Sequence, residues 1–438
     1  MQTSIATGQR PAGVRFILVT VFLDVLGIGL IIPVLPALVG EFTVSRDLQA
    51  YWYGALSAAY GVMQFFVAPL LGALSDRFGR RPILLVSIFG LGADFLLTAL
   101  ASSLWILLLA RLIGGATGAG FSVANAYIAD VTPPEQRSAS FGVLGAAFGL
   151  GFIIGPIVGG LLGAYDLRLP FFAAASLSVL NGLYGFFVLP ESHPRSLRSG
   201  FSLAKANPFS ALVALSKLRG VGGLIGVYAL NVLAQFILQM TWVLYTGFRF
   251  GWGPRENGIA LFVVGLVAAI VQAGLLRTLL KHFGEVRTTL FGMASGAIAY
   301  TLYGLAEQGW MMYAIIFANF ASFAVAPALQ GIISKAVDST KQGMTMGSLN
   351  AISSIMIVLA PLLGTPLLAQ AGQLAPPDWR VGATFFLCAV LQAIALALAY
   401  RHFGGRRNAK LFGSPRETSV SGATDTLPTG RRKEDQQG

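Results

Sequence analysis

Three charged residues lie inside segments that are otherwise apolar: Asp24, Asp94 and Arg111. Charge in the interior of a membrane is costly and usually serves a function. All three residues belong to the first half of the chain, so they could line one cavity. The ionisation of a carboxyl group there depends on its burial and on the nearby arginine, so it can titrate in a range that suits proton coupling. The alternative is structural, with each aspartate neutral or paired to Arg111.

A second group of charges lies in the stretch GALSDRFGRRPILL, residues 72–85, between two apolar runs. Asp76 falls at the end of a helix, where the helix dipole disfavours an anion, so it should seek a cation such as Arg80. Gly79 supplies the permissive backbone that a turn needs. The stretch is either a basic turn that only sets membrane topology or a charge cluster with a role of its own.

A third pattern is the segment GLGFIIGPIVGGLLG, which places glycines at 151, 155, 159 and 163. A spacing of four puts them on one face of a helix, where a neighbouring backbone can approach closely. Pro156 within the ladder should bend or loosen that helix. Helix packing alone is the alternative explanation of the ladder.

The composition indicates the elements that must hold these residues. The chain has 438 residues, of which 55% are hydrophobic and 11% charged, whereas a soluble chain carries roughly twice that charged fraction. Apolar runs of about 20 residues recur, each long enough to cross a bilayer, and the ten-residue alternation of an outer-membrane barrel is missing. We therefore predict an all-α polytopic membrane protein with twelve spans, at about 16–38, 52–74, 83–101, 104–127, 138–163, 170–189, 220–245, 257–280, 288–306, 310–334, 343–369 and 381–402.

The basic residues predict the orientation of these spans. The net charge is +12, which could indicate nucleic acid, but its distribution is typical of membrane topology. With a cytoplasmic N-terminus, 24 of the 30 Lys and Arg residues fall in cytoplasmic segments, as the positive-inside rule requires. Both termini should then be cytoplasmic. The first apolar run is interpreted as a retained helix rather than a signal peptide.

Several chemistries find no support in the sequence. The single cysteine, Cys388, makes no intramolecular disulfide, and there is no Cys/His cluster spaced for a metal. No phosphate-binding P-loop motif is present, which removes a self-contained ATPase pump. We therefore expect no cofactor, no metal and no nucleic-acid partner.

The chain divides into two similar halves. We predict a six-helix bundle over 1–189, a cytoplasmic linker over 190–219, a second bundle over 220–402 and a disordered cytoplasmic tail over 403–438. An offset of 205 relates matching residues: Gly79/Gly284, Trp105/Trp310, Gly142/Gly347, Pro156/Pro361 and Gly159/Gly364. Parallel repeats about an axis normal to the membrane are an architecture of transporters.

The charged stretch resembles motif A of the major facilitator superfamily. It matches at every defining position: Gly72, Leu74, Asp76, Arg77, Gly79, Arg80 and Arg81. In that family the aspartate and the arginines form a charge relay at the cytoplasmic face that latches one conformation. Lys281 occupies the position of the aspartate in the second half, so the resemblance implies that the latch there is absent or altered.

Two further motifs carry the same resemblance. Gly155, Pro156, Gly159 and Gly160 resemble motif C, which marks the drug:proton antiporters of the superfamily. Arg111 in R-L-I-G-G resembles motif B, which is associated with proton transfer.

Most of the chain is most similar to the tetracycline:proton antiporters of the twelve-helix branch, through segments 23–36, 75–85, 128–137, 145–160, 249–252 and 327–331. This likeness implies roles for Asp24, Asp76, Arg80, Asp94, Arg111 and Asp130, and we add Arg137 to a cytoplasmic charge network with Asp130. The chain departs from the family at Gly296, where members carry an aspartate in the ninth span. Proton coupling would then fall to Asp24 and Asp94.

The second half should contribute polar but uncharged walls to a substrate cavity, and by the same resemblance Gln64 looks like a polar cavity residue of the first half. The candidate cavity residues are Gln64, Asn125, Asn231, Gln235, Gln239, Trp242 and Gln330. Such walls suit amphipathic drugs, although helix packing can explain each residue by itself.

Together these features predict a secondary active transporter in the bacterial inner membrane that exports tetracycline-like or other amphipathic drugs in exchange for protons. We expect a monomer whose partners are the drug, protons and lipid, and which is not an enzyme. The alternatives are a proton-coupled sugar or metabolite symporter of the same fold and a membrane receptor or scaffold that does not transport.

Overall fold

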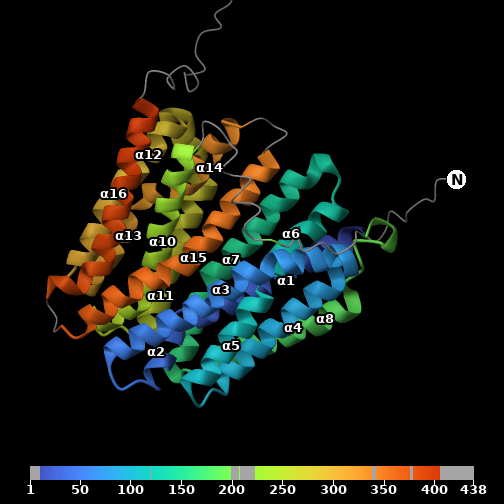
Figure 1. The fold of residues 1–438 in the computed structure, drawn as a ribbon, viewed down its shortest axis with the longest axis horizontal. Helices are drawn as coiled ribbons and strands as arrows, with labels where there is room; N and C mark the ends of the chain where they lie inside the picture. The colour runs from blue at the N-terminus through green and yellow to red at the C-terminus, as the bar shows by residue number, and fades with distance from the viewer. Residues whose placement is uncertain are drawn as a thin grey trace, which may run out of the picture.

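The computed structural model describes residues 10–118, 120–198, 207, 222–337, 342–374 and 378–404, and within them the fold is entirely helical (Figure 1). The predicted linker 190–219 is described only over 190–198 and at 207, and the predicted tail 403–438 only at 403–404. The other parts of both segments lie outside the described residues.

The described part of the first half contains eight α-helices. They are α1 (Arg10–Ile31), α2 (Leu35–Gly40), α3 (Arg46–Phe78), α4 (Arg80–Ala99), α5 (Leu104–Thr117), α6 (Gly120–Val131), α7 (Arg137–Tyr165) and α8 (Leu169–Val188), with short 3-10 turns η1 (Pro134–Gln136) and η2 (Arg195–Leu197). The first predicted span, 16–38, is divided between α1 and α2. Pro33 in the intervening turn has no N–H to continue α1, and Pro36 lies in the first turn of α2, where proline is accepted.

The second half follows a similar order. It contains α10 (Gly222–Phe250), α11 (Pro254–Ala269), a π-helical turn η3 (Ile270–Leu275), α12 (Leu276–Leu305), α13 (Gly309–Ala318), the 3-10 turn η4 (Phe320–Ala324), α14 (Val325–Lys335), α15 (Gln342–Gly372), the 3-10 turn η6 (Trp379–Gly382) and α16 (Ala383–Gly404). The helices of the second half (yellow-green to red) lie toward the upper left of Figure 1, and those of the first half (blue to green) lie along its lower and right-hand sides.

The helices account for the predicted spans. Among the described residues, ten helical runs are long and apolar enough to cross a membrane, and α13 with η4 and α14, bent by 51°, gives an eleventh. The run Pro254–Leu305 has 52 residues, about twice what one crossing needs. At Gly284 its backbone leaves the helical region (φ 75°, ψ 164°), which divides the run into the two predicted spans 257–280 and 288–306.

The two halves meet along two seams, α3 against α15 and α7 against α11. On the first seam Gly54 of α3 lies so close to Thr365 of α15 that a Cβ at this glycine would overlap the threonine side chain. On the second, the position of a Cβ at Gly160 of α7 is 2.8 Å from the Cα of Gly258 in α11. The seams are therefore tightly packed toward the ends of the helices that carry these residues.

The same helix faces are free at the other end of the molecule, which we call the basic end because it carries Arg77, Arg80 and Arg81. Gly142, Gly145 and Gly149 continue the helical stripe of Ile153 and Gly160 along α7, yet no described atom lies within 4 Å of the position of a Cβ at any of these three glycines. Gly72 is equally open on the stripe of α3 that contains Gly54 and Gly61. The halves therefore separate toward the basic end.

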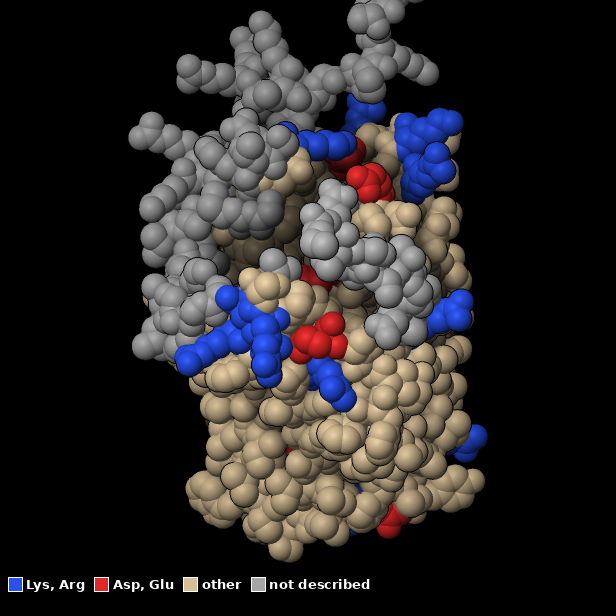
Figure 2. Space-filling model, turned by 90° about the vertical axis from the view of Figure 1, so that its right-hand side faces the viewer, with Lys and Arg blue, Asp and Glu red and all other residues tan. Residues whose placement is uncertain are grey.

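A space-filling view agrees with this separation. Figure 2 shows lysine and arginine side chains in the upper part of one face, on either side of a hollow, whereas the lower part carries few charges. Within the described residues, the molecule is thus open between its halves at the basic end and closed at the opposite end.

Candidate functional site

A cavity of about 260 Å³ lies inside the first half, and Asp24 is its acidic residue. Its polar lining also includes Tyr60, Gln64, Ser87 and Thr117, which come from α3, α4 and α5, while Phe121, Phe148 and Leu91 contribute apolar surface. The cavity therefore joins one carboxyl group to hydroxyl, amide and aromatic groups, a combination that suits an amphipathic ligand.

The carboxylate of Asp24 is held by an amide. Asn181 of α8 donates from Nδ2 to Asp24 Oδ1 at 3.3 Å, and Thr20 donates from its hydroxyl to Asn181 Oδ1 at 3.2 Å. Among the described residues no lysine or arginine forms an ion pair with Asp24. The Asn181 amide is therefore the polar side chain that contacts Asp24, and the carboxyl group faces the cavity without a cationic partner among those residues.

Asp94 and Arg111 form a separate pair between α4 and α5. Arg111 Nη2 donates to Asp94 Oδ1 at 2.6 Å and to the Thr98 hydroxyl at 3.2 Å. The side chains of Asp94 and Arg111 are only 1% and 6% exposed. Gly114 makes room for the pair, because the position of a Cβ there is 2.7 Å from Asp94 Cγ.

The structure therefore divides the three predicted intramembrane charges. Asp24 faces the cavity, whereas Asp94 and Arg111 are enclosed and are not part of its lining. The alternative in which an aspartate is paired to Arg111 holds for Asp94 and not for Asp24.

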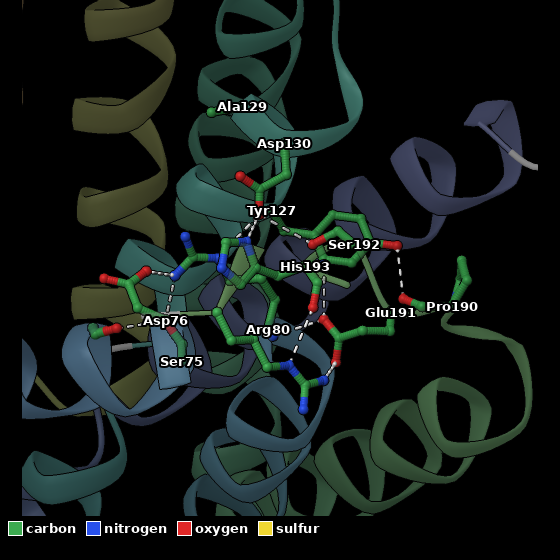
Figure 3. A network of polar contacts seen from close by, with 12 residues as sticks. Ser75, Asp76, Arg80, Tyr127, Ala129, Asp130, Pro190, Glu191, Ser192 and His193 are labelled. Carbon is green, nitrogen blue, oxygen red and sulfur yellow. Dashed lines mark hydrogen bonds and ion pairs between the residues drawn. The ribbon is translucent and has the colours of Figure 1, made fainter. Parts of the chain in front are cut away.

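At the basic end, Arg80 is the centre of a charge cluster (Figure 3). Its Nη1 lies 2.6 Å from Asp76 Oδ1 and its Nε 3.1 Å from Asp130 Oδ2, and it also donates to the Ser75 hydroxyl at 2.6 Å. The cluster joins the turn between α3 and α4 to the end of α6. Asp76 has the local cationic partner that its place at the end of α3 predicted.

Sequence reasoning missed the acceptor that completes this cluster. Glu191, three residues after the end of α8, accepts from the backbone N–H of Arg80 at 2.8 Å and from that of His193 at 3.0 Å. It thereby satisfies one of the free N–H groups at the start of α4. Gly79 has φ 106°, and a Cβ there would overlap the Glu191 carboxylate. A carboxylate directly after an apolar run was the signal in the sequence, but only the packing of α8 beside α4 brings it to this helix end.

The other arginines of this region have different partners. Arg81 donates to the carbonyl of Phe186 at 2.5 Å, and Arg77 lies over the ring of Phe78, 5.2 Å from its centroid. Arg137, expected in a network with Asp130, donates to the carbonyls of Thr132 and Ala129 at 3.3 and 3.0 Å. No ion pair joins Arg137 to Asp130 among the described residues, so Arg137 fastens the loop before α7 instead.

The glycine ladder of α7 packs against two neighbours. Gly151, Gly155 and Gly159 lie against the backbone of α1, where the position of a Cβ at Gly155 is 2.6 Å from the Cα of Gly29. Gly160 faces α11 of the second half. The ladder therefore contributes to packing inside the first half and to the seam between the halves. α7 is continuous across Pro156.

The polar residues of the second half form small groups of their own. Gln330 donates to the hydroxyl of Tyr228 at 3.4 Å, Trp242 packs edge-on against Tyr303, and Gln235 and Gln239 are half-buried on α10. In the first half, Asn125 donates to the Phe121 carbonyl at 2.9 Å and Gln64 to that of Gly118 at 3.5 Å. Of the seven candidate cavity residues, Gln64 lines the cavity beside Asp24.

Asn231 belongs to a buried amide pair that the sequence did not reveal. Gln392 of α16 donates from Nε2 to Asn231 Oδ1 at 3.1 Å, and both residues are 1% exposed. The position of a Cβ at Gly296 is 3.4 Å from Gln392 Nε2. Gly296, where the resemblance implies an aspartate in other members, therefore adjoins neutral amides.

Comparison with known proteins identifies the family of this arrangement. The sequence model of the Major Facilitator Superfamily matches residues 17–361 and, in a second match, residues 279–429. The chain belongs to the major facilitator superfamily. Members of this superfamily are membrane transporters rather than enzymes.

Individual relatives and a solved structure agree. The class C tetracycline resistance protein of Escherichia coli is 41% identical over 85% of this chain and 93% of its own length, and the class B protein of Escherichia coli is 35% identical over 90% and 98%. A bacterial homologue of the lysosomal transporter Spinster, solved in an inward-facing, unoccupied conformation, has a TM-score of 0.73 at 17% identity and covers 94% of this chain and 100% of its own.

These findings confirm the predicted superfamily, the all-α membrane fold and the likeness to tetracycline resistance proteins. The chain is a multi-pass membrane protein homologous to bacterial efflux-type transporters.

Proposed function

We propose that the protein exports tetracycline-like or other amphipathic drugs in exchange for protons, by alternating access between its two halves. The observation that carries this proposal is Asp24, a carboxylate without an ion-pair partner among the described residues, on the wall of a polar and aromatic cavity. The 41% identity to a tetracycline resistance protein supports drugs of that kind as substrates.

The proposed orientation places the basic end at the cytoplasm of a bacterial inner membrane, with both termini on that side and the protein acting as a monomer. The 24 of 30 basic residues in the segments assigned to this side support it. In this orientation the structure is open toward the cytoplasm. A drug would therefore reach the cavity from inside the cell, as export requires.

Asp24 would couple the drug to the proton. A carboxylate on the cavity wall favours a cationic or hydrogen-bonding drug, while a bound proton removes the charge that disfavours closing the cavity over it. Drug and proton thus stabilise different states, which is the condition for either to drive the conformational change. The Asp94–Arg111 pair would keep α4 and α5 together throughout the cycle because neither partner can be exposed singly without leaving a buried charge.

The test uses inverted membrane vesicles of a pump-deficient bacterium that expresses the chain. Tetracycline and a panel of amphipathic cations should enter the vesicles while protons leave, and Asp24→Asn should abolish drug-dependent proton release. Asp166→Asn is the matched control, because Asp166 is an exposed carboxylate between α7 and α8. Co-directional movement of drug and protons would contradict export by exchange, and normal coupling in Asp24→Asn would contradict the assigned proton site.

A further inference from the structure

The two halves share an unusual backbone feature exactly one repeat apart. Gly79 has φ 106° and ψ 160°, and Gly284 has φ 75° and ψ 164°. This region of backbone angles is open essentially to glycine alone. Each glycine lies in a turn between two consecutive spans at the basic end. The offset of 205 residues therefore relates equivalent turns of the fold.

Within the part of the chain that the structure describes, the same offset relates three pairs of charged residues, and in each pair the sign is inverted. An acid, a base and an acid in the first half correspond to a base, an acid and a base in the second: Asp76/Lys281, Arg80/Glu285 and Asp130/Lys335. Considered alone, Lys281 indicates a lost or altered cluster. Together, the three positions indicate a cluster that is kept with its polarity reversed.

The geometry supports this correspondence for two of the three pairs, Arg80/Glu285 and Asp130/Lys335. Arg80 directly follows Gly79 and pairs with Asp130 near the end of α6, Nε to Oδ2 at 3.1 Å. Glu285 directly follows Gly284 and pairs with Lys335 at the end of α14, Oε1 to Nζ at 2.6 Å. Both ion pairs therefore join the residue after the turn to the end of the second span beyond that turn, across the same 50 residues.

Each pair positions one seam helix at its open end. The turn at Gly79 ends α3, which packs on α15, and the turn at Gly284 ends the span formed by α11, η3 and the start of α12, which packs on α7 through α11. The anchored helix ends are those that must approach the other half when the basic end closes. An ion pair beside each turn therefore fixes the orientation of the seam helix end that approaches the other half.

We propose that Glu285 and Lys335 are positioning residues for transport, and that with Lys281 they form a polarity-inverted counterpart of the cluster at Asp76, Arg80 and Asp130. The inference rests on the proposed transport function. Lys335 is 69% exposed and Glu285 25%, so the pair contributes little to overall stability. Its effect belongs to the closing step, where a displaced helix end slows the approach of α11 and α12 to α7.

The test is charge reversal of each partner and of both. Glu285→Lys and Lys335→Glu should each lower the maximal rate of drug transport by about two- to fivefold, the range of a partly exposed pair, with the KM for drug unchanged. The double swap Glu285→Lys/Lys335→Glu should restore the rate. Arg380→Gln is the matched control: it breaks the Asp378–Arg380 pair, whose side chains are 60% exposed at the arginine and 22% at the aspartate, away from the basic end.

A second readout needs no transported drug and so separates this inference from the proposed function. Cys388 is buried, so Gly142→Cys supplies an accessible thiol on the open stripe of α7. Each single reversal should speed its labelling by a soluble thiol reagent, because closure becomes rarer, and the double swap should return the rate to that of the parent. Equal labelling in all variants, a double swap no better than the singles, or an Arg380→Gln effect of equal size would overturn the inference.

Discussion

The same substitution, aspartate to asparagine, should destabilise the protein strongly at Asp94 and hardly at all at Asp24. In Asp94→Asn, Arg111 keeps its charge in an enclosed position but loses the carboxylate 2.6 Å away. Breaking a buried ion pair from one side costs about 3–5 kcal/mol, which is roughly a 10²- to 10⁴-fold change in the folding equilibrium. In Asp24→Asn, the residue loses only its charge, because the asparagine carbonyl can still accept the 3.3 Å hydrogen bond from the Asn181 amide.

Thermal unfolding of the purified protein in detergent measures the difference. Asp94→Asn should lower the midpoint far more than Asp24→Asn, which should remain close to the parent while losing proton coupling. The double variant Asp94→Asn/Arg111→Gln provides the decisive comparison, because it removes both charges and should recover at least half of the lost stability. An Asp94→Asn protein as stable as Asp24→Asn, or a double variant no more stable than the single one, would refute this assignment of roles.

Three further predictions concern glycines. Gly284→Ala should destabilise the protein by about 1–3 kcal/mol, because the backbone region at φ 75° is strained for any residue with a side chain. Unfolding in detergent measures this loss against the control Gly274→Ala, a helical glycine with equal space for a Cβ. Gly145→Leu should abolish transport but preserve drug binding, because the added side chain fills the space that must close between α7 and the second half. The control is Gly222→Leu at the start of α10, where a Cβ also meets no described atom within 4 Å. Unimpaired transport in Gly145→Leu would contradict the closing motion. Gly296→Asp would place a carboxyl group beside the amide of Gln392, so we expect more protons exchanged per drug molecule in vesicles, with Gly296→Asn as the uncharged control, and an unchanged ratio would contradict a proton site there.

The sequence predicted the helices well because hydropathy alone decides which segments can cross a bilayer. The local breaks were harder. The turn between Ile31 and Leu35 depends on where two prolines fall relative to the end of the helix, and the continuity of α11 into α12 depends on a π-helical turn that hydropathy does not detect. Span number and order were therefore predictable, whereas span boundaries were accurate only to within several residues.

Contacts within the site were predictable only where sequence neighbours make them. Asp76 and Arg80 are four residues apart, so the end of one helix and the start of the next bring them together. Glu191 is 111 residues from its partner Arg80, and Gln392 is 161 residues from its partner Asn231. No local sequence pattern predicts the helix packing that brings them together. The roles of Asp24 and Asp94 were equivalent in the sequence for the same reason, because the rotation of α1 and α4 decides which one faces the cavity.

The inverted charges bear on why a repeat can keep its architecture while its motif is lost. An ion pair between a turn and a neighbouring helix end fixes the same geometry whichever partner is the acid, because the attraction depends only on the product of the two charges. Exchanging one residue alone is unfavourable, so the acid and the base must change together, and here all three positions have changed. A motif defined by residue types then disappears from the second half, whereas the turn at Gly284 and the pair beside it remain. In the first half, Glu191 also accepts a hydrogen bond from the backbone N–H of Arg80 at the start of α4. Gly79 leaves room for this carboxylate, because a Cβ at that position would overlap it.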